Sequence, residues 1–166
     1  IRGIDGDVLV QPFQYSLPGL IFTASGAYLD GQYLEYENGS GINELGILTK
    51  NYNFKGNHTV RTPKYSYNLG VTYTQEIGEG TFESGVSYYY NDGYFFDPQN
   101  VAVQPSYTLV NARLTYLYTP LGFRVTVFGA NLGNSEYFLT RFPVDFNISG
   151  NYAPPRMYGV RLEYSF

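Results

Sequence analysis

At 166 residues the chain has the length of one domain, and its formal net charge at pH 7 is −4. The negative charge argues against a nucleic-acid partner, which requires clustered Lys and Arg, and the lack of cysteine excludes disulfides, zinc–thiolate sites and cysteine nucleophiles. Aromatic residues make up 19% and charged residues 14% of the chain, proportions typical of a sheet that carries aromatic belts at two membrane interfaces.

The sequence contains no run of about 18 apolar residues, so it predicts no transmembrane helix. It has no signal peptide, and it opens at Ile1 within a strand-like pattern. We therefore expect the chain to be a piece of a longer precursor.

Apolar and polar residues alternate in seven stretches, the pattern of strands whose two faces meet different surroundings. The first four predicted strands cover residues 4–11, 20–29, 65–75 and 81–91. The third is the clearest, because Tyr65, Leu69 and Val71 share one face while Asn68 and Thr72 share the other.

The last three predicted strands cover residues 107–118, 123–131 and 156–166. In the final strand Tyr158, Val160, Leu162, Tyr164 and Phe166 alternate with Gly159, Arg161, Glu163 and Ser165. Each stretch has about the 9 to 11 residues that a tilted strand needs to cross a bilayer. The pattern predicts an all-β, antiparallel transmembrane β-barrel segment with lipid on one side and a polar interior on the other.

The predicted connectors alternate between short and long. The short ones cover residues 14–19, 76–80 and 119–122, and the long ones cover residues 30–64, 92–106 and 133–154. An outer-membrane barrel has short periplasmic turns and long extracellular loops. The last strand follows a long loop, so Phe166 is expected at the periplasmic rim. Tyr and Phe also fall in two bands near the strand ends, which their general preference for strands does not explain.

Four segments carry a family resemblance. They are residues 61–73 (RTPKYSYNLGVTY), 109–116 (LVNARLTY), 127–137 (VFGANLGNSEY) and 155–166 (PRMYGVRLEYSF). In this order and spacing they resemble the C-terminal end of the barrel of TonB-dependent outer-membrane receptors. The resemblance implies a barrel of about 22 strands around a plug, with residues 1–166 as its C-terminal portion.

Seven strands alone cannot close a barrel, because each unpaired backbone group in hydrocarbon costs several kcal/mol. We therefore expect the remaining strands of the same barrel, the plug and the segment that engages TonB to lie outside this chain. The terminal strand, with Tyr158, Gly159, Val160, Leu162, Tyr164 and Phe166, also resembles the signal read by the barrel-assembly machinery. A terminal barrel strand would alternate in this way in any case.

The sequence gives little support to catalysis. The single histidine, His58, lies in a long loop with no Ser or Cys placed beside it by a motif. Asp5 and Asp7 could pass for a general acid–base pair, and we interpret them as carboxylates facing the lumen. We expect no enzymatic activity, no cofactor and no metal site.

Ligand contacts are expected from the long loops, where aromatic residues accompany a few cations. The candidates are His58, Tyr94, Phe95, Arg141, Phe142 and Tyr152. Stacking and charge-assisted hydrogen bonds suit a bulky anionic ligand such as a ferric siderophore. The same residues could instead pack the loops together or contact lipopolysaccharide.

The resulting hypothesis is an integral receptor of the bacterial outer membrane that imports a scarce nutrient, with a ferric siderophore as the leading cargo, in a TonB-dependent manner. Cobalamin, haem, nickel complexes and glycans remain open as cargo. The alternatives are a passive porin-like or structural barrel, and a soluble β-sandwich that binds carbohydrate.

Overall fold

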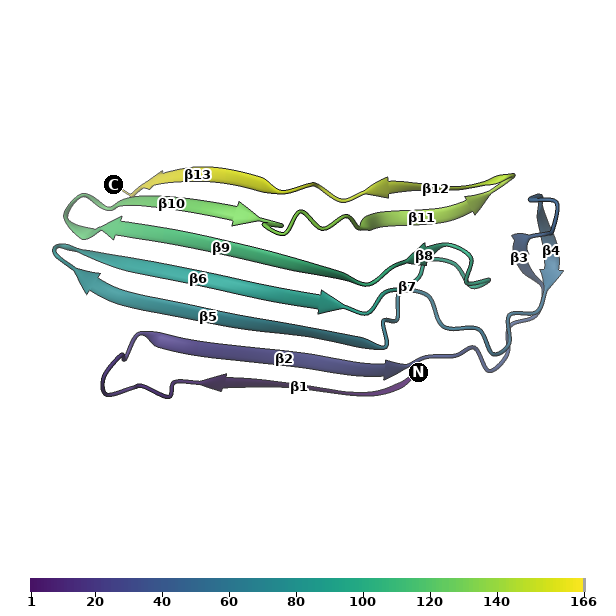
Figure 1. Cartoon of the computed structure of the whole chain (residues 1–166), viewed down its shortest axis with the longest axis horizontal. Helices are drawn as coiled ribbons and strands as arrows, with labels where there is room; N and C mark the ends of the chain where they lie inside the picture. Colours follow the sequence, from purple (N-terminus) through teal and green to yellow (C-terminus); the bar gives the residue numbers. More distant parts are fainter. Residues whose placement is uncertain (166) are drawn as a thin grey trace.

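Seven long strands form one antiparallel sheet in a computed structural model that describes residues 1–165. They are β1 (Arg2–Val10), β2 (Leu20–Asp30), β5 (Tyr65–Ile77), β6 (Gly80–Asn91), β9 (Tyr107–Tyr118), β10 (Phe123–Ala130) and β13 (Met157–Tyr164). Each pairs with the next in this order (Figure 1). All seven predicted strands are confirmed, with ends displaced by a few residues. No helix in residues 1–165 is long and apolar enough to cross a membrane.

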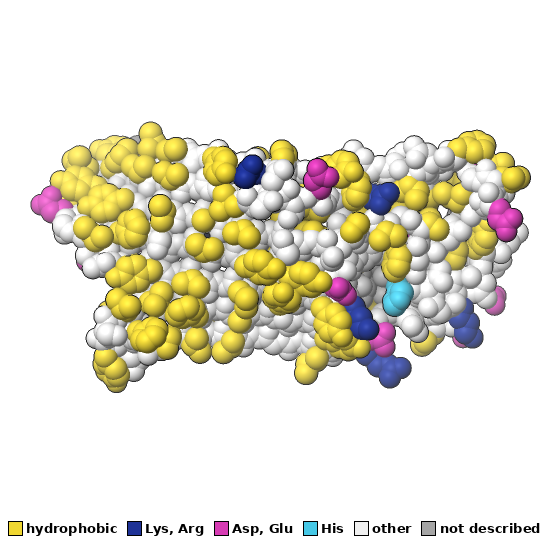
Figure 2. Space-filling model, in the orientation of Figure 1, with side chains coloured by type: hydrophobic (Ala, Val, Ile, Leu, Met, Phe, Trp, Pro, Cys, Tyr) yellow, Lys and Arg dark blue, Asp and Glu magenta, His cyan; other side chains and the backbone are white. Residues whose placement is uncertain are grey.

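The strand register places the predicted apolar residues on one continuous face of the sheet. Val71 on β5 pairs with Phe22 on β2 and with Val86 on β6. Across the sheet, Val127 on β10 pairs with Val160 on β13. Hydrophobic side chains accordingly gather over the strands (Figure 2). Because the period is two, the residues between them form a second, polar face.

The sheet has no dry core on either side. Among residues 1–165 the only buried hydrophobic residues are Phe54 and Ala102, and both lie in loops. Leu114 and Val127, in the middle of the apolar face, are 52% and 50% exposed. Within residues 1–165 these side chains are not buried against a second sheet, as they would be in a soluble β-sandwich.

Short connectors join the strands at one end of the sheet. Gly78, between β5 and β6, has a φ of 63°, which favours glycine. Between β9 and β10 a single 3₁₀ turn, η1 (Thr119–Leu121), ends at Gly122 with a φ of 59°, and the Gly122 N–H donates to the Thr119 carbonyl. The predicted tight turns between β5 and β6 and between β9 and β10 are thus confirmed.

Long connectors join the strands at the opposite end, and each contains a hairpin that the sequence did not predict. These are β3 (Gly39–Ile42) with β4 (Leu48–Tyr52), β7 (Tyr94–Phe95) with β8 (Val103–Gln104), and β11 (Phe138–Val144) with β12 (Asn147–Tyr152). Figure 1 shows β11 and β12 continuing beyond the ends of β10 and β13, with β3 and β4 beside their tip.

Side-chain amides of the second long loop hold the first. Gln99 accepts from the Ile42 N–H at 2.7 Å and donates to the Ile42 carbonyl at 2.8 Å. Asn100 does the same to His58, with distances of 2.8 and 3.0 Å. Each side-chain amide thus satisfies a backbone N–H and a backbone carbonyl, as a neighbouring strand would. These hydrogen bonds fix the first two loops to one another.

Candidate functional site

A cluster of tyrosines lies where the polar face of the sheet meets the long loops. Tyr107, the first residue of β9, stacks on Tyr137 of the third loop, with ring centroids 4.6 Å apart and planes 4° apart. Tyr89, near the end of β6, lies 6.0 Å from Tyr107, and its hydroxyl accepts a hydrogen bond from Asn91 at 2.8 Å. Two strand ends and one loop therefore build this part of the cluster.

The first and second loops complete the cluster with a cation. The Arg61 guanidinium lies 5.4 Å from the centre of the Phe96 ring, and Tyr94 lies edge-on to Phe96 at 5.0 Å. Burial raises the pKa of the Tyr94 phenol above its ordinary value of 10.0, and the nearby charge of Arg61 opposes that rise. Arg61 itself is exposed to solvent.

The predicted residues His58 and Phe95 are brought together. Their rings stack at 5.7 Å with planes 17° apart. The His58 backbone is held by Asn100, as described above, and by a bridge to Gln32. His58 and Phe95 therefore join the second loop to the first, next to the cluster that holds Tyr94.

The other three predicted ligand residues lie on the β11–β12 hairpin. Phe138 lies between Arg141 at 4.4 Å, in a cation–π contact, and Tyr152, whose ring stacks at 4.3 Å. The Arg141 guanidinium also donates to the Val103 carbonyl of β8 at 2.6 Å. Phe142 and Tyr152 are 50% and 62% exposed. The six predicted residues thus form two groups, one on the first and second loops and one on the β11–β12 hairpin.

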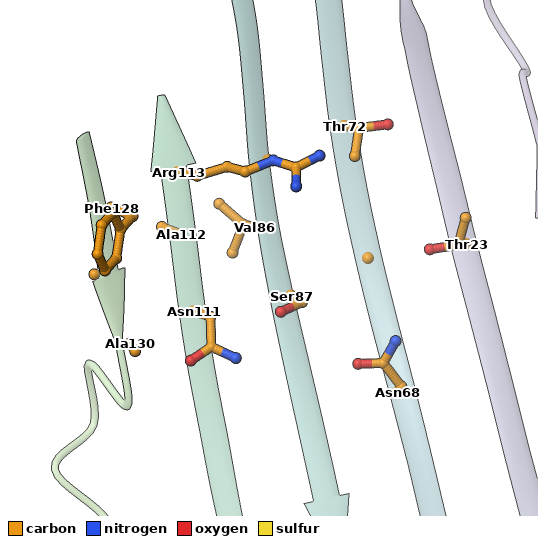
Figure 3. A pocket seen from close by; sticks show the side chains of 13 residues that line it. Thr23, Asn68, Thr72, Val86, Ser87, Asn111, Ala112, Arg113, Phe128 and Ala130 are labelled. Atoms are coloured by element: carbon orange, nitrogen blue, oxygen red, sulfur yellow. The ribbon is translucent and has the colours of Figure 1, made fainter. Parts of the chain in front are cut away.

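A shallow hollow of about 390 Å³ lies lower on the polar face. Its lining includes the polar residues Thr23, Asn68, Ser87 and Asn111 and the apolar residues Val86 and Phe128. In Figure 3 the side chain of Arg113 extends from β9 across β6 toward Thr72 on β5. Arg113 pairs with Gly85 of β6, where the lack of a side chain leaves room for the guanidinium.

A family model described as "TonB dependent receptor-like, beta-barrel" matches residues 1–134. The chain belongs to the TonB-dependent receptor family. It supplies part of that family's β-barrel, as the antiparallel sheet and its alternating connectors lead one to expect.

Solved structures share the fold of this receptor chain. The ferric yersiniabactin uptake receptor FyuA from Yersinia pestis superposes with a TM-score of 0.73 at 15% identity, over 95% of this chain and 22% of its own. The ferric preacinetobactin receptor BauA from Acinetobacter baumannii superposes with a TM-score of 0.67 at 20% sequence identity. The match covers 99% of this chain and 22% of BauA. The siderophore receptor PiuA from Acinetobacter baumannii superposes with a TM-score of 0.62 at 23% sequence identity. The match covers 87% of this chain and 19% of PiuA. The chain thus spans about a fifth of the length of these receptors.

The final strand of the receptor chain has the predicted alternation. Tyr158, Val160, Leu162 and Tyr164 are exposed on the apolar face. Gly159 lies on the polar face opposite Phe128, where a Cβ atom would come within 2.4 Å of the Phe128 ring. Packing against Phe128 therefore accounts for this glycine. Phe166 lies outside the described residues, and recognition by the assembly machinery stays a prediction.

Tyr89 and Tyr107 were missed as site residues in the sequence. Both lie on the polar face, Tyr89 between Ser87 and Asn91 on β6 and Tyr107 four residues before Asn111 on β9. A bulky phenol on the polar face was the signal that could have found them. Among residues 1–165 no group of three or more His, Asp or Glu side chains could hold a metal ion.

Proposed function

We propose that the intact protein is a receptor of the bacterial outer membrane that binds a ferric siderophore with its long loops and imports it in a TonB-dependent manner. Membership of the TonB-dependent receptor family supports the class of transporter. Three proteins of similar structure, the ferric yersiniabactin uptake receptor, the ferric preacinetobactin receptor and the siderophore receptor PiuA, support the cargo.

The observation that carries this proposal is the cluster of Tyr89, Tyr94, Tyr107, Tyr137 and Arg61. Its aromatic faces can stack on an aromatic or planar ligand, and its phenols can donate hydrogen bonds to ligand oxygens. The exposed guanidinium can pair with a carboxylate or phenolate. A ferric siderophore offers such groups on a bulky anionic complex.

Two of the predicted ligand residues lie on the β11–β12 hairpin and are accessible to a ligand. Phe142 and Tyr152 expose half or more of their surface. Arg141 uses one N–H for the Val103 carbonyl, which leaves further donors for a ligand oxygen. His58, Tyr94 and Phe95 would contact the ligand from the first and second loops. We propose all six as ligand contacts.

The two faces of the sheet suit a membrane barrel. Exposed Val, Leu and Tyr side chains on one face would contact acyl chains, and the rims would meet lipopolysaccharide outside and the periplasm inside. The polar face would line a lumen closed by the remaining strands of the same barrel and filled by a plug that engages TonB. The terminal strand would be read by the barrel-assembly machinery during insertion.

Deleting the gene tests the proposal. We expect iron-regulated expression and loss of growth on a specific ferric siderophore, restored by the full-length gene. The same loss should follow removal of TonB. Uptake that survives removal of TonB would contradict the proposal and favour the passive, porin-like barrel.

A further inference from the structure

A polar hollow interrupts the apolar face of the sheet next to the long loops. This rim hollow measures about 290 Å³, and its lining includes Tyr90, Ser106, Thr108, Ser135 and Glu136. Tyr90 on β6 pairs with Thr108 on β9, and the Thr108 and Ser135 hydroxyls lie 3.4 Å apart. Because Thr108 shares its face of β9 with Leu114 by alternation, the rim hollow lies on the side of the sheet that would meet the membrane.

The remaining strands of the barrel would not cover the rim hollow. The strands β6, β9 and β10 lie inside the sheet, each with a neighbour on both sides (Figure 1). Further strands would join the sheet at its edges, β1 and β13, and a plug would fill the opposite, polar side. The rim hollow therefore opens toward the surroundings of the barrel wall.

The rim hollow lies at the expected level of the lipid headgroups. Phe82 and Tyr90 lie on the same face of β6, about 27 Å apart along the strand. The apolar band of an outer-membrane barrel is about 25 Å tall and is flanked by two aromatic girdles. Beside the rim hollow, the Tyr67 ring stacks on Tyr90 at 5.0 Å and on Tyr88 at 6.1 Å. These rings have the place of the girdle nearer the long loops.

The lining of the rim hollow suits an uncharged sugar. Tyr67 lies on one side of Tyr90, and the small Thr108 lies on the other, so this side of the Tyr90 ring can pack against a sugar ring. The Tyr90 hydroxyl donates to Asp92 Oδ1 at 3.0 Å, and its oxygen can still accept from a sugar hydroxyl. The Glu136 carboxylate can also accept from a hydroxyl, whereas it would repel a phosphate.

We propose that the rim hollow binds the sugar headgroup of a glycolipid in the outer leaflet of the membrane. This inference rests on the proposed membrane barrel and goes beyond the import of a cargo. A lipid-linked sugar is favoured over a free sugar because the apolar face continues from the rim hollow along the strands. Val86 and Leu114, each 52% exposed, lie on that face and would contact the alkyl chain, which adds an affinity that a free sugar lacks.

Binding of radiolabelled dodecyl maltoside to the full-length receptor in phosphatidylcholine nanodiscs tests the site, with empty nanodiscs as background. We expect saturable binding below micelle-forming concentrations. Neither free maltose nor the sugar-free dodecyl dimethylamine oxide should displace the probe at equal concentration. Thr108→Leu fills the rim hollow and Glu136→Ala removes its carboxylate, and each should weaken binding about tenfold. Ala24→Leu, which places the same side chain on the apolar face of β2, is the matched control and should bind as the wild type does.

Other results would overturn the sugar site. Equal displacement by dodecyl dimethylamine oxide would mean that only the alkyl chain is bound, and equal displacement by maltose would mean that the site takes a free sugar. Stronger displacement by dodecyl phosphate with Mg²⁺ would indicate a phosphate headgroup. Binding that is not saturable, or that is unchanged by Thr108→Leu and Glu136→Ala, would place no sugar in the rim hollow. A receptor that does not enter nanodiscs would instead contradict the proposed membrane barrel.

Discussion

The Asp145 carboxylate, at the tip of the β11–β12 hairpin, accepts a hydrogen bond from the Leu48 N–H of β4 at 2.7 Å. Beside it the Phe146 N–H donates to the Gly46 carbonyl. The third loop is therefore joined to the first at their tips, above the second loop. Because Asp145, Leu48 and Phe146 are exposed, both contacts compete with water.

Removing this carboxylate should loosen the hairpin tip. We expect Asp145→Ala to increase hydrogen exchange of the Leu48 amide about tenfold, since one charge-assisted hydrogen bond is lost. Asp145→Asn keeps an acceptor and should exchange at close to the wild-type rate. Equal exchange in all three proteins would show that the tips separate without this contact.

The Gln104 side chain should contribute to the stability of the contact between the second and third loops. It is 1% exposed, accepts the Phe138 N–H at 2.7 Å and donates to the Pro105 carbonyl at 2.9 Å. Gln104→Ala leaves the Phe138 N–H without an acceptor, which costs about 1–3 kcal/mol. Amide exchange at Phe138 should rise accordingly, whereas Gln14→Ala in the exposed β1–β2 connector should leave it unchanged.

The phenol of Tyr94 provides a pH test of the cluster. Burial raises its pKa above 10.0, so the protonated phenol is favoured in the folded loops. This contribution to stability is present below pH 10 and is lost as the pH rises through the raised pKa. Arg61→Gln should raise the pKa further, because the guanidinium favours the phenolate. Phenolate absorbance of the variant, with Tyr94→Phe as the reference, checks this; an unchanged pKa would place Arg61 away from Tyr94.

Adjacent residues of β5 should respond oppositely to a charge. Val71 lies on the apolar face at the middle of the strand, and Thr72 lies on the polar face. Val71→Arg should destabilise the protein in lipid vesicles by about 2–4 kcal/mol, and Thr72→Arg should cost far less. Denaturant titration of the refolded receptor measures both. Similar costs would mean that the two faces meet similar surroundings.

The sequence predicted the strands well because two different surroundings select residues in alternation. Val71 and Thr72 differ in polarity for this reason, and the same signal recurs in all seven strands. The short turns could also be predicted from the sequence, since Gly78 and Gly122 adopt the positive φ angles that favour glycine. Their alternation with long loops identified the two ends of the sheet.

The loops could not be read in this way. Their hairpins are short, and β7 and β8 have two residues each, too few for a periodic pattern. Their contacts also join residues far apart in sequence, as Asn100 joins His58. The candidates Arg141 and His58 were chosen by residue type, but whether they point to a ligand or to a neighbouring ring depends on these contacts.

Nitroxide scanning of β5 tests the central claim most directly. Single cysteines at each position from Tyr65 to Ile77 of the full-length receptor in lipid vesicles would carry the label, and its accessibility to oxygen and to a water-soluble nickel complex would be measured. We expect oxygen accessibility to peak at Tyr67, Leu69, Val71 and Tyr73 and to fall at each residue between them. Low oxygen accessibility at all four positions would show that this face is packed against protein, and the assignment to a membrane barrel would be wrong.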